Sequence, residues 1–441
     1  MAVRYITVTP VTKLFKPATR AFGDIAIVGA AEDEAKGPMK IPVPITNPDS
    51  LPYSKTTTLS SDVNVSSTSI TVVSSSDFPD VPFIARIDNE IINVTAINEP
   101  TWTVTRGAEG TIAASHANGA EVIFKKDIPV DDALWFKGDL GNSVRIAFEQ
   151  TPGPTTVWAV RIDPGENEEA LKNALAEVAK LDVQIVALAN TPLKSAAESK
   201  TAIEALASHV STVSKSGGDG KERIGIAMLG KGVTNPEVIT TNMSIDRMVM
   251  VAHQSDEDAA AAVAGTIAGY EPHISLLLKQ VKIGMDELFS DAEMEAFDNA
   301  RVNWLTDPSL LPGKGLFMGE AYTLGVDMPY IDIVRTVDDV SFRLKAALIR
   351  SIGDLRVSRS GLRTLVSQMT AVLEPLKQRE VIEGYDVFIP LLVLLDKEPA
   401  DLTDAELQQI NDAQNNRVVD AIVSVDYAGA IHRLNITLKF V

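Results

Sequence analysis

The alternation of hydrophobic and polar residues is clearest at the two ends of the chain. Within 430–441, apolar side chains recur at every second position from 434 onward, which is typical of a half-buried β-strand. Residues 2–9 are rich in β-branched and aromatic side chains and also predict a strand. The pattern leaves two interpretations open, because a terminal strand must pair either with its own sheet or with that of a neighbouring subunit.

The first 53 residues predict an extended arm, one buried strand and a linker. Pro10 and Pro17 disfavour regular structure in the arm, 1–21. An apolar run at 22–30 predicts a buried strand that begins the core domain. Five prolines within 31–53 predict a linker, so we assign 22–53 to the start of the core domain and this linker.

A shift in composition marks residues 54–128. Serine and threonine dominate its first third, and almost no helical periodicity follows. Short β-rich runs lie at 69–73, 83–87, 90–96, 101–105 and 121–125, with turn residues between them. Strands at this spacing predict a small all-β barrel or sandwich, inserted into the host domain as a self-contained module.

Strand and helix patterns alternate from residue 129 onward. Buried-type strands are predicted at 156–162, 183–189, 223–229 and 248–253, and helices at 167–180, 195–214 and 256–269. This alternation predicts a layered α/β core domain over 129–330.

The last segment, 331–441, predicts a second α/β domain that ends in the terminal strand. Its expected helices are 340–352, 361–379 and 404–415, the last opened by Thr403. Its expected strands are 330–337, 417–427 and a strand or strand pair at 382–395, where Pro390 suggests an edge or a bend. A turn at 427–430 allows the last two strands to form a hairpin.

Composition narrows the function classes. The chain has 441 residues, enough for about two to four domains. A net charge of −19 argues against general nucleic-acid binding. The absence of cysteine excludes disulfides and thiolate metal sites. No apolar run approaches the ~20 residues of a membrane helix, and the first residues lack a secretory pattern, so we expect cytoplasmic folding without membrane insertion.

No residue set predicts catalysis, a metal or a cofactor. The five histidines lack metal-ligand spacing, and no GxSxG elbow occurs. The glycine-rich 217–221 fails the phosphate-loop pattern because Glu222 follows Lys221. We therefore expect no enzyme, while an α/β enzyme with an unrecognised site stays open as an alternative.

One stretch, 341–363, is positively charged although the chain as a whole is negatively charged. It holds a single acid, Asp354, against six basic residues: Arg343, Lys345, Arg350, Arg356, Arg359 and Arg363. This cluster is either a solvated helix face or a surface that docks on an acidic protein.

Several segments resemble, in order, motifs of the tail-sheath proteins of contractile phages and related injection systems. They are 260–270 (AAAVAGTIAGY), 315–327 (GLFMGEAYTLGVD), 330–335 (YIDIVR), 380–385 (EVIEGY), 420–441 and the helices 340–352 and 362–376. The resemblance covers roughly two-thirds of the chain. Glu380 stands where the family motif has a glycine.

The predicted β module carries a separate resemblance. Residues 88–94 (DNEIINV), 106–111 (RGAEGT) and 116–122 (HANGAEV) are similar to a small module of many phage structural proteins. Its glycines are expected at turns with positive φ.

The family resemblance implies a non-enzymatic subunit that stacks as hexameric rings around an inner tube and contracts to drive the tube through a target envelope. Its implied partners are further copies of itself, the inner tube protein, and baseplate and tail-terminator proteins, with no nucleic acid. Its implied location is the virion tail, after assembly in the host cytoplasm. The alternative is another virion tail or baseplate protein that forms a closed ring.

The resemblance also suggests two sets of contact residues. The terminal strands would join neighbouring subunits through Val3, Tyr5, Ile6, Val8, Leu434, Ile436, Leu438 and Phe440. The inner tube would be contacted by Arg343, Lys345, Arg350 and Arg356.

Overall fold

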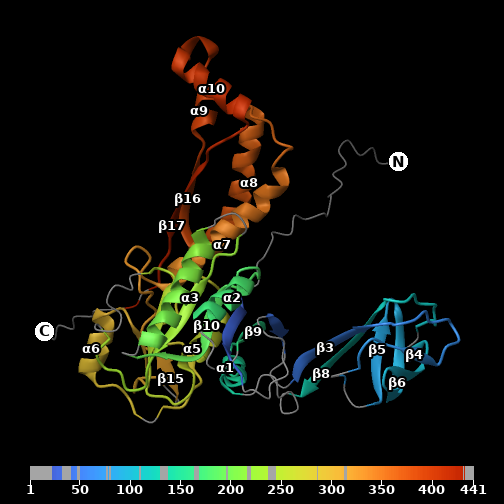
Figure 1. Ribbon diagram of the computed structural model, residues 1–441. Helices are drawn as coiled ribbons and strands as arrows, with labels where there is room; N and C mark the ends of the chain where they lie inside the picture. Colours follow the sequence, from blue (N-terminus) through green and yellow to red (C-terminus); the bar gives the residue numbers. More distant parts are fainter. Residues whose placement is uncertain are drawn as a thin grey trace, which may run out of the picture.

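The structure is a computed structural model. It describes residues 22–31, 41–46, 50–75, 78, 81–108, 111–129, 138–162, 168–194, 197–215, 220–236, 245–285, 287–311, 315–430 and 432. These residues form a central α/β body, a separate β module at one side and a long projection at the C-terminal end (Figure 1).

A nine-stranded sheet forms the body, in the order β13-β15-β14-β12-β11-β10-β1-β9-β2. The strands from β14 to β9 are parallel, and β13, β15 and β2 are antiparallel to their neighbours. Their bounds are β1 Asp24–Ala30, β2 Val43–Ile45, β9 Thr156–Ile162, β10 Ile185–Leu193, β11 Ile224–Leu229, β12 Met248–Ala252, β13 Gln280–Val281, β14 Asn303–Thr306 and β15 Leu316–Met318. Every residue of β11 and β12 is buried, as expected for parallel strands covered on both faces.

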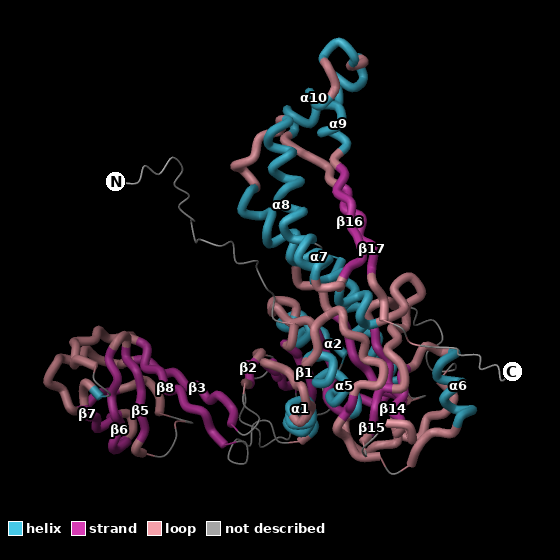
Figure 2. The backbone as a smooth tube through the Cα atoms, turned by 180° about the vertical axis from the view of Figure 1, so that it is seen from behind, coloured by secondary structure: helices cyan, strands magenta, loops and turns pink. Residues whose placement is uncertain are grey.

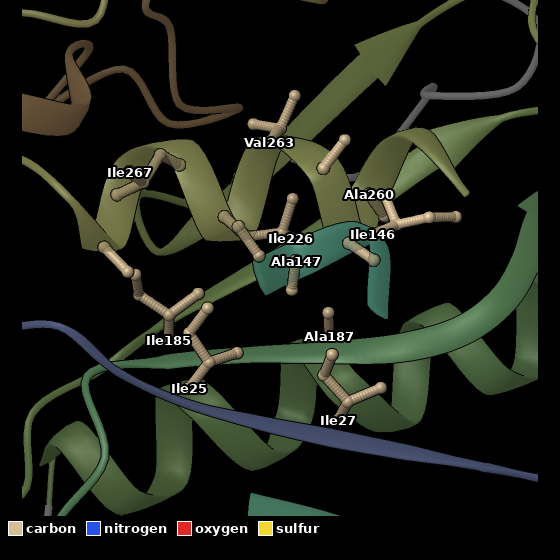
Figure 3. Packing of buried hydrophobic residues seen from close by; sticks show 14 of the residues in the cluster. Ile25, Ile27, Ile146, Ala147, Ile185, Ala187, Ile226, Ala260, Val263 and Ile267 are labelled. Carbon is tan, nitrogen blue, oxygen red and sulfur yellow. The ribbon is translucent and has the colours of Figure 1, made fainter. Parts of the chain in front are cut away.

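Helices cover both faces of this sheet. Side chains alternate along β1, so Ile25 and Ile27 pack with α1 (Asp139–Phe148) and α5 (Ala259–Ala268), as Figure 3 shows. Ala26 and Val28 pack on the opposite face with α2 (Glu168–Val178) and α3 (Ala197–Lys215). Helix α6 (Asp291–Asn299) lies at the far end of the body (Figure 1).

The glycine of the motif at 260–270 has a packing role. All residues of α5 are buried, and a Cβ on Gly265 would overlap the carbonyl oxygen of Ala147 in α1. Gly265 therefore lets the two helix backbones approach closely.

We expect Gly265→Ala to destabilise the body by about 2 kcal/mol. Overpacking against a backbone oxygen outweighs the gain of about 1 kcal/mol that alanine brings to a helix. Thermal denaturation should be compared with Gly284→Ala, an exposed site where the nearest atom to an added Cβ is 3.8 Å away. Equal melting temperatures for the two variants would contradict the close helix contact.

The β module is a six-stranded sheet in the order β3-β8-β5-β6-β7-β4, which lies apart from the body and joins it through β3 and β8 (Figures 1 and 2). Its strands are β3 Ser50–Thr58, β4 Ser69–Thr71, β5 Phe83–Ile87, β6 Glu90–Asn98, β7 Thr101–Thr105 and β8 Glu121–Pro129. Trp102, Phe83 and Phe124 form its aromatic core through edge-to-face contacts.

The linker predicted at 31–53 contains one strand and the beginning of another, so this prediction is corrected. Within it, β2 pairs with β9 at the sheet edge, and β3 begins at Ser50. Pro44 lies inside β2, which is compatible with an edge strand because proline has no N–H to donate.

The C-terminal projection contains α7 (Ile331–Leu348), α8 (Arg359–Gln378), α9 (Pro390–Asp396), α10 (Asp404–Asn416), and the short turns η3 (Ile349–Ser351) and η4 (Pro399–Asp401). Two antiparallel strands, β16 (Ile382–Phe388) and β17 (Ile422–Tyr427), run along it (Figure 1).

Two predictions for this region are wrong. The strand expected at 330–337 is the first half of α7, and the second half of the strand expected at 382–395 is α9. Pro390 is the first residue of α9, where its missing N–H costs no hydrogen bond.

Candidate assembly surfaces

The β16–β17 pair is a sheet of only two strands among the described residues. One face packs on the projection's hydrophobic core, where Tyr385, Val387, Val423 and Val425 contact a cluster that includes Leu373 of α8. No residue of β17 is fully buried. A two-stranded sheet is marginal in water, so this pair is suited to receive a further strand.

Exposed apolar side chains also gather on the projection. Eight large hydrophobic residues are exposed there: Val337, Ile349, Ile352, Phe388, Val393, Leu407, Val418 and Ile422. Ile352, at 78 % exposure, lies in the turn between α7 and α8.

The chain beyond β17 is attached to the body at His432. Its Nδ1 lies 2.9 Å from Oε1 of Glu320, and its Nε2 lies 2.9 Å from Oγ of Ser275. Its ring packs edge-on against Tyr330, with 4.7 Å between centroids. His432, the last described residue, is therefore fixed to the body near the start of α7.

The strand residues predicted to join neighbouring subunits lie outside the described residues. They are Val3, Tyr5, Ile6, Val8, Leu434, Ile436, Leu438 and Phe440. Their role stays a prediction.

The structure divides the basic cluster of 341–363 into paired and unpaired members. Arg343 forms an ion pair with Asp339 at 2.8 Å, and Lys345 forms one with Glu222. Arg359 and Arg363 both pair with Asp396, near the end of α9. These four cations therefore have ion-pair partners within the subunit.

Arg350 and Arg356 remain available for a partner. Both are exposed in the turn between α7 and α8, and no described carboxylate forms an ion pair with either one. Both belong to the four residues predicted to contact the inner tube, and that role stays a prediction.

Sequence reasoning missed the charged junction between body and projection. Arg247 binds Asp338 of α7 through two hydrogen bonds of 2.7 Å. Burial lowers the pKa of Arg335 to about 10, although nearby Asp339 and Asp332 favour its charged form. Arg335 donates to the carbonyl oxygen of Tyr270 at 2.8 Å, beyond the end of α5. This junction joins α7 firmly to the body.

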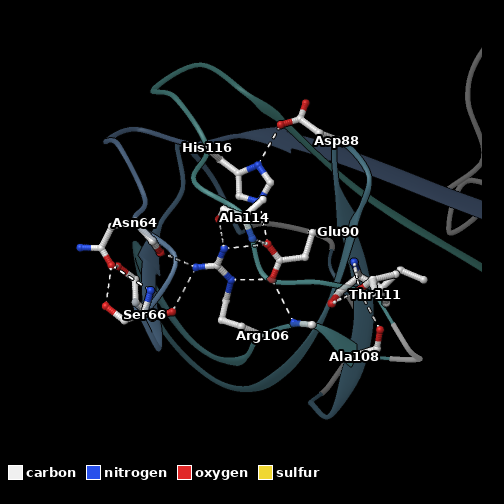
Figure 4. Close-up of polar contacts among 12 residues, drawn as sticks. Asn64, Ser66, Asp88, Glu90, Arg106, Ala108, Thr111, Ala114 and His116 are labelled. Carbon is white, nitrogen blue, oxygen red and sulfur yellow. Dashed lines mark hydrogen bonds and ion pairs between the residues drawn. The ribbon is translucent and has the colours of Figure 1, made fainter.

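The β module contains a second buried polar network (Figure 4). Arg106 donates two hydrogen bonds of 2.7 Å to Glu90, and His116 contacts Glu90 and Asp88 at 2.8 Å each. Burial raises the pKa of Glu90, but hydrogen bonds from Arg106, Ala114 and His116 outweigh it and lower that pKa to about 2. The network ties together the segments that resemble the phage module.

Two of the module's motif glycines lie in turns with positive φ, as expected. Gly107 has φ 63° and Gly119 has φ 86°. Gly110 is outside the described residues.

The strongest candidate for a catalytic carboxylate is buried Asp258, beyond the end of β12. Its pKa is raised by burial, although Ser143 and the backbone N–H groups of Asn190 and Ala261 donate to it. Those donors belong to α1, β10 and α5, so Asp258 caps α5 and joins three elements. The carboxylate oxygens of Asp258 accept hydrogen bonds that hold these elements together, so their role is structural.

The described residues contain neither a metal-binding cluster nor a helix that could span a membrane. No group of three or more acidic or histidine side chains is arranged to hold a metal ion. Within the same residues, no helix has the length and apolar character needed to cross a bilayer.

Solved structures share this architecture. The contracted helical sheath protein of the anti-feeding prophage aligns over 100% of this chain and 99% of its own, with TM-score 0.55 and 12% identity. The fold is that of a contractile-sheath protein. The mixed α/β class predicted from the sequence is thereby confirmed.

Two further structures share the sheath fold over part of the chain. The contracted PVC sheath of an extracellular contractile injection system matches 68% of this chain and 80% of its own, with TM-score 0.50 and 15% identity. A chain of the anti-feeding prophage baseplate matches 69% and 81%, with TM-score 0.51 and 12% identity. No family model and no curated protein matches this sequence.

Proposed function

We propose that this chain is the structural, non-enzymatic subunit of a contractile tail sheath. The observation that carries the proposal is the sheath fold, which extends over the whole length of the chain. The two-stranded β16–β17 sheet adds support, because it is suited to accept a strand from another copy.

In this proposal, subunits form hexameric rings that stack around an inner tube and contract to drive the tube through a target envelope. Residues 2–9 and 433–441 extend sheets of neighbouring copies. The body contains β1, β2 and the elements from α1 to β15, the projection begins at 331, and the β module, from β3 to β8, decorates the sheath. The inner tube, baseplate and tail-terminator proteins are the partners, and the virion tail is the location.

The proposed tube contact is the turn that carries Arg350 and Arg356. We expect the double change to glutamate to weaken co-sedimentation of sheath with tube by roughly tenfold, because like charges then face an acidic partner. Both side chains are exposed, so folding is retained. The matched control is Lys172→Glu with Lys180→Glu, two exposed cations on and just after α2. If both double variants bind the tube equally well, another surface contacts it.

Negative-stain electron microscopy of the purified protein, alone and with the tube protein, tests the function. Long hollow tubes or stacked rings are expected. Single closed rings would instead favour a baseplate or other ring-forming tail protein, an alternative supported by the likeness to a baseplate chain. Monomers under both conditions would overturn the proposal.

A further inference from the structure

A groove lies between the body and the projection at the point where the described chain begins. Its volume is about 180 Å³. The body lines it with Phe22 and with the loop after α5, and the projection lines it with α7 and the end of α8. Because Phe22 is the first described residue, the N-terminal arm, 1–21, joins the body at this junction groove.

The junction groove has an apolar floor and a charged rim. Pro272, Leu376 and Val381 line it and are buried. At the rim, Arg379 of the projection forms an ion pair with Glu271 of the body. A segment that lies in the groove would therefore place small apolar groups on the floor and polar groups at the rim.

A buried donor without an acceptor lies beside this groove. A smaller cavity of about 30 Å³ shares Phe22, Pro272 and Asp339 with it and is also lined by Arg335 of α7, which is 6 % exposed. Nη2 of Arg335 donates to the carbonyl oxygens of Tyr270 at 2.8 Å and Phe22 at 3.5 Å. Its Nη1 is buried and has no hydrogen-bond partner among the described residues. Since an unsatisfied buried donor is costly, a further acceptor is expected here.

The surrounding charges indicate which acceptor fits. Glu222, Asp338 and Asp339 line the same small cavity, so an anion would be repelled there. A neutral carbonyl oxygen is not repelled. Arg335 already donates to one main-chain carbonyl where the arm begins, that of Phe22.

The residues that precede Phe22 have the composition that the groove requires. The sequence of 17–21, which we call the root of the arm, is PATRA. Apart from Arg20 its side chains are small, and Pro17 favours an extended backbone. Arg20 is long enough to reach the acid at the rim, Glu271. The whole arm contains four cations and no acid.

We propose that the root, 17–21, occupies the junction groove of its own subunit, with a main-chain carbonyl oxygen of the root accepting a hydrogen bond from Nη1 of Arg335. The direct link to Phe22 gives the root a high effective concentration at the groove, which favours it over the arm of another copy. The arm is then clamped to α7, so a pull on residues 2–9 acts on the projection and not on β1 alone. This inference does not depend on the proposed sheath function.

A competing account fills the small cavity with water. Buried water commonly satisfies polar groups that lack a protein partner. In that account the root makes no fixed contact with the groove, and Arg335 has no influence on the arm.

Disulfide trapping in the full-length chain separates the two accounts, because the chain has no natural cysteine. The test pair is Ala18→Cys with His273→Cys, on the wall of the groove. The matched control is Ala18→Cys with Thr155→Cys, an exposed residue outside the groove whose N–H donates to the carbonyl oxygen of Gly23. We expect the test pair to form an intramolecular disulfide about tenfold faster under mild oxidation, because only its cysteines are held within bonding distance. Equal rates, or disulfide-linked dimers as the main product of the test pair, overturn the proposal.

Limited proteolysis gives a second readout within the arm. Trypsin can cut after Lys13, in the outer arm, and after Arg20, in the root. We expect Arg335→Met to speed the cut after Arg20 by about tenfold, because the root is released, and to leave the cut after Lys13 unchanged. The control is Arg161→Met, at a buried arginine of β9 outside the groove. An unchanged rate after Arg20 in a folded Arg335→Met variant overturns the clamp. The disulfide comparison does not use this variant, so it decides alone if Arg335→Met unfolds.

Discussion

Deleting residues 434–441 is expected to leave a folded monomer that cannot polymerise. The deletion removes Leu434, Ile436, Leu438 and Phe440 but retains His432 and its contact with Glu320. In the proposed function, each subunit then keeps its acceptor sheet and lacks the strand that would fill a neighbour's. Because that strand would link each copy to the next, its loss should abolish assembly.

Sedimentation and electron microscopy would measure this loss, with circular dichroism to verify the fold. The matched control replaces the polar residues Asn435 and Thr437 with serine, which keeps the strand and its apolar row. Full-length tubes from the truncated chain would show that the C-terminal strand does not connect subunits. A truncated chain that is unfolded would show instead that the strand completes its own subunit.

Replacing Glu90 with glutamine is expected to destabilise the β module by about 3–5 kcal/mol, the usual result of breaking a buried ion pair. Arg106 would lose its charged partner while remaining buried, and His116 would lose one of its two carboxylates. Amide hydrogen exchange in β5 and β6 of the module should become faster, while exchange in β11 and β12 of the body stays unchanged. Glu121→Gln, at an exposed position, is the control.

The lowered pKa of Glu90 predicts that the stability of the β module depends on pH. The pKa of this carboxylate is lowered from 4.5 to about 2 in the folded module, so its stabilising effect is complete above pH 4.5. The effect is lost as the pH falls toward 2, because the folded state must then accept a proton it binds poorly. The glutamine variant should lack this loss. Equal acid sensitivity of the two proteins would assign the effect to other groups.

The sequence predicted regular elements well where the hydrophobic pattern was simple. The strands β5 and β7 lie at the predicted residues, because their side chains alternate between core and solvent. The first half of α7 was missed because its buried face includes Asp332, Arg335 and Asp338. A pattern that counts only apolar residues sees Ile331, Ile333 and Val334 and predicts a strand.

The candidate contact surfaces were predicted only in part. Charge counting found the basic cluster, but it could not separate Arg350 and Arg356 from the cations paired with Asp339, Glu222 and Asp396. Glu222 and Asp396 lie far away in the sequence or on another element, so only the fold reveals those pairs, whereas Asp339 lies one turn before Arg343 within α7. The His432 attachment was missed for the same reason, since Glu320 is remote in the chain.

The continuity of α7 has a mechanical consequence. Its Ile331 and Val334 belong to the hydrophobic core of the body, whereas Val340 belongs to that of the projection, and the helix is unbroken between them. Eighteen residues give a shaft of about 27 Å. The ion pair between Arg247 and Asp338 fixes the middle of this helix to the body. In the proposed sheath, a neighbour that pulls on the projection would therefore turn the whole body with it, so that bending would occur between copies and not within the subunit.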